Sequence, residues 1–439
     1  MPLPFDWKFR RSLKYGDQGV TRTIPPSETI RRIAPLMPVI GVTRIADVTG
    51  LDRVGIPNFV SVRPRDRHGI TYYNGKGRTR IGAKAGAMME ALERYSGERC
   101  DLEVFYGTRN EMRRRGRALD PAGIIVPWFE EYRSSTRLEW VEGFDLIARE
   151  PTYVPLNSVV QPYEAAKGRR LYYSSTNGLA SGNTMEEAVC HALCEVIERD
   201  AAAISGVALE LKPAVSRILS GIGMAQPLDR SIDGRFSLID LKSLPAFARR
   251  LVRKFEAARL KVFLRNLTCT AGIPTFECTI VETQLDGRHL AHGGSGTHPD
   301  ARVAVSRALT EAAQSRVGCI QGGREDLPNI VRERVEFDPD DVFGVGPVAP
   351  FSAVTSFEHG RIDHDIEFLL RRLQREGLEQ VVAVDLTRPE LGVPVVKIII
   401  PNAETWTVFH LHAERSKFGP RVRQLMNGAS SCHAARRIA

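Results

Sequence analysis

The feature that most constrains this chain is a unit that occurs three times. In each copy a glycine-rich stretch runs into a segment of helical periodicity that carries acidic or amide side chains three positions apart, with an arginine close behind. Residues three apart lie on one face of a helix, so each pair can direct its oxygens toward the same object. The pairs are Glu90 and Glu93 in the first copy, Glu195 and Glu198 in the second, and Glu311 and Gln314 in the third.

The spacing of these acids predicts a shared binding site. Two facing pairs of carboxylates repel each other unless a cation lies between them. Hard oxygen ligands suit Mg²⁺, which is readily shared with nucleotide phosphates, and glycines at a helix start let backbone N–H groups approach phosphates. A single Glu-x-x-Glu-Arg also occurs on solvated helix faces, but three copies, each after a glycine-rich stretch, favour a common site. The spacings of a P-loop and of a Rossmann dinucleotide motif are absent.

Composition places the chain among soluble globular proteins. Its 439 residues can bury a large core, and 43% hydrophobic with 26% charged residues is ordinary for that class. The seven cysteines are scattered and odd in number, which fits reduced thiols in a cytoplasmic protein. Cys190 and Cys194 are spaced like a metal pair, but no second pair completes the set, so we expect them to be small core residues.

The net charge of +9 does not come with a nucleic-acid-binding signature. The densest basic cluster, residues 113–117, is predicted to be a solvated helix end, with a surface for an acidic partner as the alternative. No basic platform interleaved with aromatic residues is visible, so nucleic acid is not an expected partner. The first residues lack an apolar signal region, and no apolar stretch is long enough to span a bilayer, so we expect no membrane partner.

The order of predicted elements indicates an α+β fold with mixed sheets and packed helices, because strands and helices do not alternate strictly. Residues 320–360 are rich in Pro, Asp and Gly and are predicted to be an irregular insertion or a mobile cover. Predicted strands are residues 40–50, 56–64, 170–178, 261–268, 274–283, 380–387 and 394–400, with a hairpin about residues 68–69; predicted helices are residues 81–99, 183–200 and beyond, 241–260 and 366–377.

The three units also resemble a known family. The blocks NGKG…MEALERYSGE, STNGLASGNTMEEAV…EVIERDA and GSGTHPDARVAVSRALTEAAQSR are similar to the nucleotide-binding blocks of the YcaO superfamily. The similarity covers roughly residues 40–401, with an N-terminal extension over residues 1–39 and a C-terminal tail over residues 402–439. The resemblance implies a YcaO-type ATP-binding fold, ATP and Mg²⁺ as cofactors, a homodimer, and activation of a peptide backbone amide by phosphorylation of its carbonyl oxygen.

The resemblance also implies roles for individual residues. The family commonly has a serine four residues before the first motif glutamate, whereas this chain has Gly86, so a hydroxyl contact to the nucleotide is missing. Carried across by position, the residues that hold Mg²⁺ are Glu90, Glu93, Glu195 and Glu198, and those that surround the nucleotide are Lys76, Asn183, Arg199, Glu311, Gln314 and Arg316.

Residues 14–57 further resemble the branch of the family that works with a TfuA partner and includes methanogenesis marker protein 1. That branch is associated with thioamide synthesis, which implies a peptide or protein substrate and a TfuA-like partner for sulfur delivery. Azoline-forming cyclodehydratases usually end in a proline-alternating segment, whereas this chain ends in NGASSCHAARRIA. We therefore expect a thioamidation enzyme. The alternatives are an azoline-forming cyclodehydratase, an enzyme acting with ATP on a non-peptide amide or carboxylate, and a non-catalytic ATP-binding scaffold for a sulfur-transfer partner.

Overall fold

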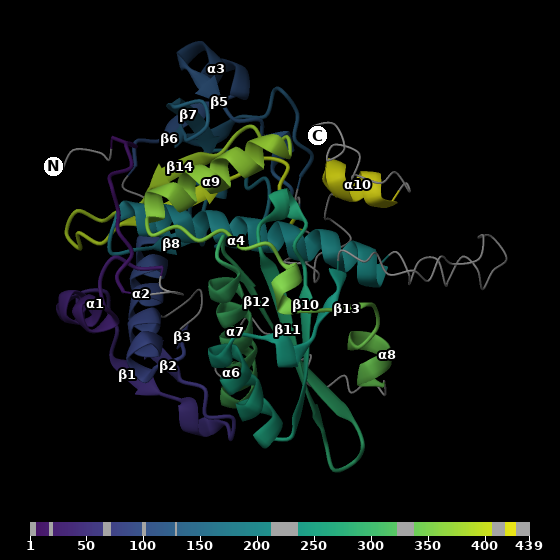
Figure 1. Cartoon of the computed structure of the whole chain (residues 1–439). Coiled ribbons are helices and arrows are strands. Elements are labelled where there is room, and N and C mark those ends of the chain that lie inside the picture. Colours follow the sequence, from purple (N-terminus) through teal and green to yellow (C-terminus); the bar gives the residue numbers. More distant parts are fainter. Residues whose placement is uncertain are drawn as a thin grey trace.

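The computed structural model describes residues 6–16, 21–64, 72–98, 102–127, 130–211, 236–322, 338–405 and 418–426. Within them the chain forms three sheets, and helices pack against the sheets and against one another (Figure 1). Two of the sheets contain both parallel and antiparallel pairs. This is the α+β architecture with mixed sheets that the order of elements predicts.

The first copy of the repeated unit lies on a small antiparallel sheet of order β1-β2-β3. Helix α2 packs against β2 and β3, and α1 packs against α2. The buried alanines Ala83, Ala87 and Ala91 follow helical spacing and form the face of α2 that meets the sheet. The hairpin predicted about residues 68–69 lies outside the described residues. The elements are α1 (Pro26–Ile33), β1 (Arg44–Asp47), β2 (Asn58–Val62), β3 (Tyr72–Lys76) and α2 (Arg80–Glu98).

The third copy lies on a second sheet, of order β12-β11-β10-β9-β13. Helix α7 packs against β12 and β11, while α6 packs against β10 and α7. Asp300 caps α7 by accepting a hydrogen bond from the backbone N–H of Arg302 (2.9 Å). The elements are β9 (Leu238–Ile239), α6 (Ala246–Ala257), β10 (Leu260–Asn266), β11 (Thr275–Thr283), β12 (His289–Thr297), α7 (Ala301–Gln321), α8 (Pro339–Phe343) and β13 (Val348–Ala349).

The expectation for residues 320–360 is partly wrong. Residues 323–337 lie outside the described residues, but α8 and β13 are regular elements. Strand β13 pairs in parallel with β9 and so becomes the edge of the second sheet. A two-residue edge strand is too short to show the alternation of side chains by which a strand is predicted from sequence.

The second copy joins the largest sheet, of order β5-β7-β6-β14-β15-β8, with β4 paired to β6. Helix α4 packs against β15 and β8, and α9 packs on α4 (Figure 1). Thr184 caps α4 at the predicted start by accepting a hydrogen bond from Glu187 N (3.3 Å). The elements are β4 (Phe105–Gly107), α3 (Arg109–Arg115), β5 (Arg117–Ala118), β6 (Leu138–Asp145), β7 (Glu150–Pro155), β8 (Leu179–Ser181), α4 (Met185–Gly206), α9 (Ile362–Arg375), β14 (Val382–Asp385), β15 (Val395–Ile399) and α10 (Pro420–Met426).

The strand predicted over residues 170–178 is wrong, because the strand that leads to α4 is β8, after that range. The backbone N–H groups of Leu171 and Tyr172 both donate to Asn157 Oδ1, at 3.0 and 3.2 Å. A side-chain oxygen therefore accepts the two backbone hydrogen bonds that the carbonyl groups of a neighbouring strand would accept in a sheet.

The N-terminal segment crosses α4 and α9. Backbone hydrogen bonds link Ile362 N to Ser12 O (2.8 Å) and Lys14 N to Gly360 O (3.0 Å). Further along, the backbone N–H of Thr23 donates to Glu187 Oε1 (2.6 Å) at the start of α4. The segment therefore covers the N-terminal end of α4, where the helix of the second copy begins. Among the described residues, every helix is too short or too polar to cross a membrane.

Close packing explains the glycines of the three units. A Cβ at Gly75 would lie 2.0 Å from Ala83 O of α2, one at Gly294 would lie 2.1 Å from Ala312 N of α7, and one at Gly182 would lie 2.5 Å from Ala188 N of α4. Gly75 and Gly294 lie within strands β3 and β12, so the expectation of phosphate-binding glycine loops is wrong for them. These glycines let each helix lie directly against its strand, which brings the acidic residues of the helices together.

Replacement of Gly294 by alanine is expected to lower the free energy of unfolding by about 1–3 kcal/mol, because the new methyl group overlaps the backbone of α7. The matched control is Gly293→Ala in the same strand, where a Cβ meets nothing within 4 Å; it should change stability by less than about 0.5 kcal/mol. Denaturant unfolding of the two variants measures the difference. Equal stabilities would contradict the packing role.

Candidate active site

A cavity of about 760 Å³ opens where α2, α4 and α7 meet near β3. All three copies of the repeated unit contribute to its wall. Its size is that of pockets that enclose small organic ligands. Eight of the ten residues selected from sequence line it: Lys76, Glu90, Glu93, Glu195, Glu198, Arg199, Glu311 and Gln314.

The carboxylates of α2 and α4 form an acidic wall whose charges are poorly compensated. Burial raises the pKa of Glu93 to about 8; Arg94 opposes this rise, and Glu90 and Glu195 add to it. Burial also raises the pKa of Glu195, although Arg199 and Arg94 oppose it. For Glu198, burial and then the nearby Glu311 raise the pKa. Each shift means that an ionised carboxylate is costly here without a further cation.

Glu311 of α7 behaves in the opposite way. Burial acts to raise its pKa, but Lys76, Arg199 and Arg307 outweigh burial and lower the pKa to about 2. The ammonium group of Lys76 contacts the Glu311 carboxylate directly. Glu311 is therefore an ionised, paired acid that joins β3 to α7, whereas Glu93, Glu195 and Glu198 make no ion pair within 4 Å among the described residues.

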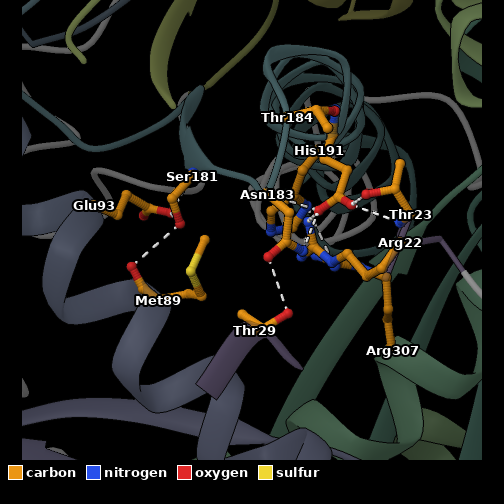
Figure 2. A network of polar contacts seen from close by, with 11 residues as sticks. Arg22, Thr23, Thr29, Met89, Glu93, Ser181, Asn183, Thr184, His191 and Arg307 are labelled. Carbon is orange, nitrogen blue, oxygen red and sulfur yellow. Dashed lines mark hydrogen bonds and ion pairs between the residues drawn. The ribbon is translucent and has the colours of Figure 1, made fainter. Parts of the chain in front are cut away.

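One acid is positioned by the second copy of the unit (Figure 2). Ser181 of β8 donates its backbone N–H to Glu93 Oε2 (3.0 Å), and its hydroxyl donates to Met89 O (3.2 Å). A residue that precedes α4 thus holds a carboxylate of α2. The acidic wall is assembled across two segments that are distant in sequence, and its geometry depends on both.

Two of the predicted residues do not reach the cavity. Asn183 donates from its backbone N and from Nδ2 to Glu187 Oε2 (2.9 and 2.8 Å) and accepts from Thr29 Oγ1 (2.9 Å) (Figure 2). Arg316 is 6% exposed and pairs with Asp52 (3.1 Å) and Glu282 (2.8 Å).

Helix geometry explains the error at Arg316. On α2 and α4 the arginine follows the first acid by four residues, which keeps it on the same face. Arg316 follows Glu311 by five residues, which turns it about 140° away from that acid. The residue of α7 in the equivalent position is Ser315, and it does line the cavity.

The cavity residues that were not assigned from sequence include Arg22, Arg94, His191 and Arg307. Arg94 could have been found, because it follows Glu93 as Arg199 follows Glu198. Arg307 lies one helical turn before Glu311, so its face was also predictable. No local sequence pattern indicates Arg22, because only the tertiary path of the N-terminal segment brings it to α4. His191 of α4 also lines the cavity.

The donor set fits a hard divalent cation. Glu198 Oε2 is buried and has no hydrogen-bond partner, and Glu93 and Glu195 supply further buried oxygens whose pKa is raised. Buried carboxylates of this kind are either protonated or bound to a cation. Oxygen-only donors shared among several carboxylates are the ligands that Mg²⁺ takes together with phosphate oxygens.

Comparison with known proteins places the chain in a class of ATP-dependent, Mg²⁺-binding enzymes. The family model described as YcaO cyclodehydratase, ATP- and Mg²⁺-binding, matches residues 74–404. The chain belongs to the YcaO family. The family resemblance, the YcaO-type fold and the cofactors predicted from sequence, ATP and Mg²⁺, are thereby confirmed.

Two relatives match most of the chain. An uncharacterized protein of Methanothermobacter thermautotrophicus is 37% identical over 92% of this chain and 98% of the relative. An uncharacterized protein in the tfuA 3′ region of Rhizobium leguminosarum bv. trifolii is 30% identical over 95% of this chain and 97% of the relative. Both alignments extend beyond the repeated units to nearly the whole of each protein.

Two solved structures share the fold. YcaO from Methanopyrus kandleri, bound with AMPPCP and Mg²⁺, is 28% identical with a TM-score of 0.67 and covers 92% of this chain and 97% of its own. A heterocyclase in complex with substrate and cofactor has a TM-score of 0.74 at 20% identity and covers 91% of this chain. This chain spans about half (54%) of the heterocyclase, so that likeness concerns the fold.

Binding of Mg²⁺ with nucleotide is expected to release a proton from the acidic wall. The pKa of Glu93 is raised to about 8, so this carboxyl is largely protonated at pH 7 and must ionise when a cation arrives. Affinity should therefore rise with pH up to about 8. Calorimetry with the preformed Mg²⁺–AMPPCP complex, in two buffers of different ionisation enthalpy, should show about one proton released at pH 7 and almost none at pH 9. Equal release at both pH values would contradict this assignment.

Gly86 lines the cavity, and a Cβ there would lie 3.5 Å from Gly75 Cα, an ordinary contact. We therefore expect Gly86→Ser to fold and to strengthen binding of Mg²⁺–AMPPCP by about 1 kcal/mol, roughly fivefold, through the added hydroxyl. Gly82→Ser, on the same helix but outside the cavity wall, is the matched control. Identical affinities for the two variants would show that position 86 does not face the nucleotide.

Proposed function

We propose that this chain converts a peptide backbone amide into a thioamide in an ATP- and Mg²⁺-dependent reaction. The observation that carries the proposal is the convergence of acids from α2, α4 and α7 on one cavity in a YcaO-family chain. The M. kandleri structure, bound with AMPPCP and Mg²⁺, supports a nucleotide at this place. The relative encoded in a tfuA 3′ region supports the sulfur-dependent branch.

In this proposal Glu90, Glu93, Glu195 and Glu198 hold Mg²⁺. When bound, the ion supplies the positive charge that neutralises the triphosphate and makes its terminal phosphoryl group electrophilic. The raised pKa values of Glu93, Glu195 and Glu198 indicate a wall that favours such a cation.

Lys76, Arg199, Glu311 and Gln314 are assigned to the nucleotide. Arg199 is the best placed of the cations, because it makes no ion pair within 4 Å among the described residues and can turn its donors to phosphate oxygens. Lys76 and Glu311 hold β3 and α7 together at the cavity. Asn183 and Arg316 are not part of the proposed nucleotide site, because their side chains bind Glu187 and Asp52.

This reaction requires the protein to position the reactants rather than to supply a strong general base. The amide oxygen is a weak nucleophile, and when it takes the terminal phosphoryl group the nitrogen keeps its hydrogen and becomes a cationic imidate. Hydrosulfide adds to the activated carbon, the carbon–oxygen bond breaks, and the thiol proton leaves on hydrogen phosphate. The task of the protein is to hold the reactants together and stabilise charge, which contributes most of the rate in phosphoryl transfer.

The proposal includes two partners beyond the peptide. A TfuA-like protein would supply sulfide, in keeping with the genomic position of the Rhizobium relative. A homodimer is carried over from the family resemblance. Cyclodehydration, in which a side chain of the peptide attacks the same activated carbon, uses the same cavity and is the competing outcome.

The glutamates provide the direct test. Glu93→Gln and Glu198→Gln should each lower product formation by on the order of 100-fold or more, because loss of even an outer-shell metal partner typically costs 10- to 100-fold. The matched control is Glu367→Gln on α9, whose side chain is 59% exposed. The assay incubates the chain with ATP, Mg²⁺, sulfide and the peptide extract of a strain lacking its gene, followed by tandem mass spectrometry.

The masses of the products separate the candidate functions. Thioamidation exchanges one oxygen for sulfur, whereas cyclodehydration removes one water. Wild-type levels of product from both cavity variants would leave the catalytic assignment without support. A product that has lost water would replace thioamide synthesis by azoline synthesis at the same site.

A further inference from the structure

A second cavity, of about 210 Å³, lies directly beside the active-site cavity. It is smaller than pockets that hold drug-sized ligands, so it suits a small molecule or ion. Four residues form part of both walls: Arg22, Lys76, His191 and Arg307. Figure 2 shows three of them, Arg22, His191 and Arg307, drawn together from the N-terminal segment, α4 and α7.

The far wall of the second cavity is lined by thiols. Cys190 and Cys194 are 6% and 2% exposed and lie one turn apart on α4. The contact with Cys194, and then burial, raise the pKa of Cys190 well above its ordinary value, so this thiol is neutral. A wall of neutral sulfur is polarizable and poorly suited to a strongly hydrated ion such as phosphate, but it accommodates a soft one.

The same wall carries a donor without an acceptor. His298 is 4% exposed, and its Nδ1 accepts a hydrogen bond from the backbone N–H of Asp300 (2.9 Å). The ring proton must therefore be on Nε2, which makes no hydrogen bond. A carboxylate oxygen, Asp365 Oδ2, lies 3.8 Å from Nε2, beyond hydrogen-bond distance. A buried N–H donor without a partner is costly and calls for an acceptor in the adjoining space.

The boundary between the two cavities carries an unpaired cation. The guanidinium of Arg307 contacts His191 Nδ1 at 3.4 Å, its Nε is buried without a partner, and it makes no carboxylate pair within 4 Å among the residues that the structure describes. Burial and the nearby Arg307 lower the pKa of His191 well below its ordinary value, so this ring does not add a second positive charge. The boundary therefore attracts one small anion.

A metal ion does not fit this cluster. Ligand atoms of Cys190, His298 and Asp365 lie within 4.8 Å of one another. However, His298 Nε2 carries the ring proton and has no lone pair to give. Asp365 is already bound by Lys14 (2.5 Å) and His359 (2.8 Å). The cluster is a hydrogen-bonding wall.

We propose that the second cavity binds hydrosulfide, the small sulfur nucleophile, and passes it between Arg22, His191 and Arg307 to the active-site cavity. This inference rests on the proposed function and names the route of its second substrate. Hydrosulfide is a small, soft monoanion that can accept from His298 Nε2 and Arg307 and lie against the thiols. In the reaction its sulfur forms a bond to the imidate carbon, and the carbon–oxygen bond breaks with its electron pair on the oxygen of the departing phosphate. The proton of the thiol leaves on hydrogen phosphate, so no oxidant or reductant is needed.

Cavity-filling variants test the route kinetically. Ser306→Leu fills the cavity from α7, and Cys194→Met fills it from α4. Each should raise the KM for sodium sulfide about tenfold, the effect expected when about 1.4 kcal/mol of binding is lost, while the affinity for Mg²⁺–AMPPCP stays within twofold. Ser306→Ala is the control and should leave the KM for sulfide unchanged. Because the two variants act from opposite walls, one that fails to fold still leaves the other to decide.

A structural readout separates this inference from the proposed function. Crystals of the full chain soaked in sodium bromide, a monoanion similar in size to hydrosulfide, should show an anomalous peak between His298 Nε2 and Arg307. An empty cavity together with an unchanged KM for sulfide in both filling variants overturns the inference. Displacement of bromide by inorganic phosphate also overturns it, because the cavity would then be a route for the phosphate product. If the wild-type chain makes no thioamide, the proposed function and the sulfur assignment fail together, even with bromide bound.

Discussion

The whole site depends on bringing carboxylates together that repel one another. Glu93, Glu195 and Glu198 lie on two helices that meet at one cavity, and each has a raised pKa because burial is not compensated. Such an arrangement persists only if the surrounding fold stabilises it and a cation relieves it. In the protein the first condition is met by close strand–helix packing. We propose that the second is met by the metal and nucleotide that the YcaO family binds.

The same repeated unit serves structure and chemistry at once. Gly75, Gly182 and Gly294 allow backbones to approach where any side chain would overlap a helix. This fixes the depth of α2, α4 and α7 against their sheets, and therefore the positions of the acids they carry. Ser181 then ties the first unit to the second through Glu93. Loss of one close contact would displace an acid as well as lower stability, so the two effects are coupled.

Much of this was predictable, and the errors have physical causes. Helical spacing selected the six acidic and amide residues of α2, α4 and α7, all of which line the cavity, because the face of a helix follows from local geometry. The family resemblance added Lys76 and Arg199, which line it too. The resemblance also assigned Arg316 to the nucleotide, although five residues of helix turn it away from Glu311. The glycines were interpreted as phosphate-binding loops, because glycine is required both at a close backbone contact and in a flexible loop, and the sequence alone does not distinguish the two. Arg22 and the thiol-lined cavity depend on tertiary contacts between distant segments, for which no local pattern exists.

The most direct test of the account is a crystal structure of the full chain with Mn²⁺ in place of Mg²⁺ and a non-hydrolysable ATP analogue. The anomalous signal locates the metal independently of the surrounding side chains. The account predicts Mn²⁺ within about 2.0–2.3 Å of carboxylate oxygens from both α2 and α4, the distance of direct coordination by a hard cation. Metal more than about 6 Å from all four glutamates, beyond direct coordination, would contradict it.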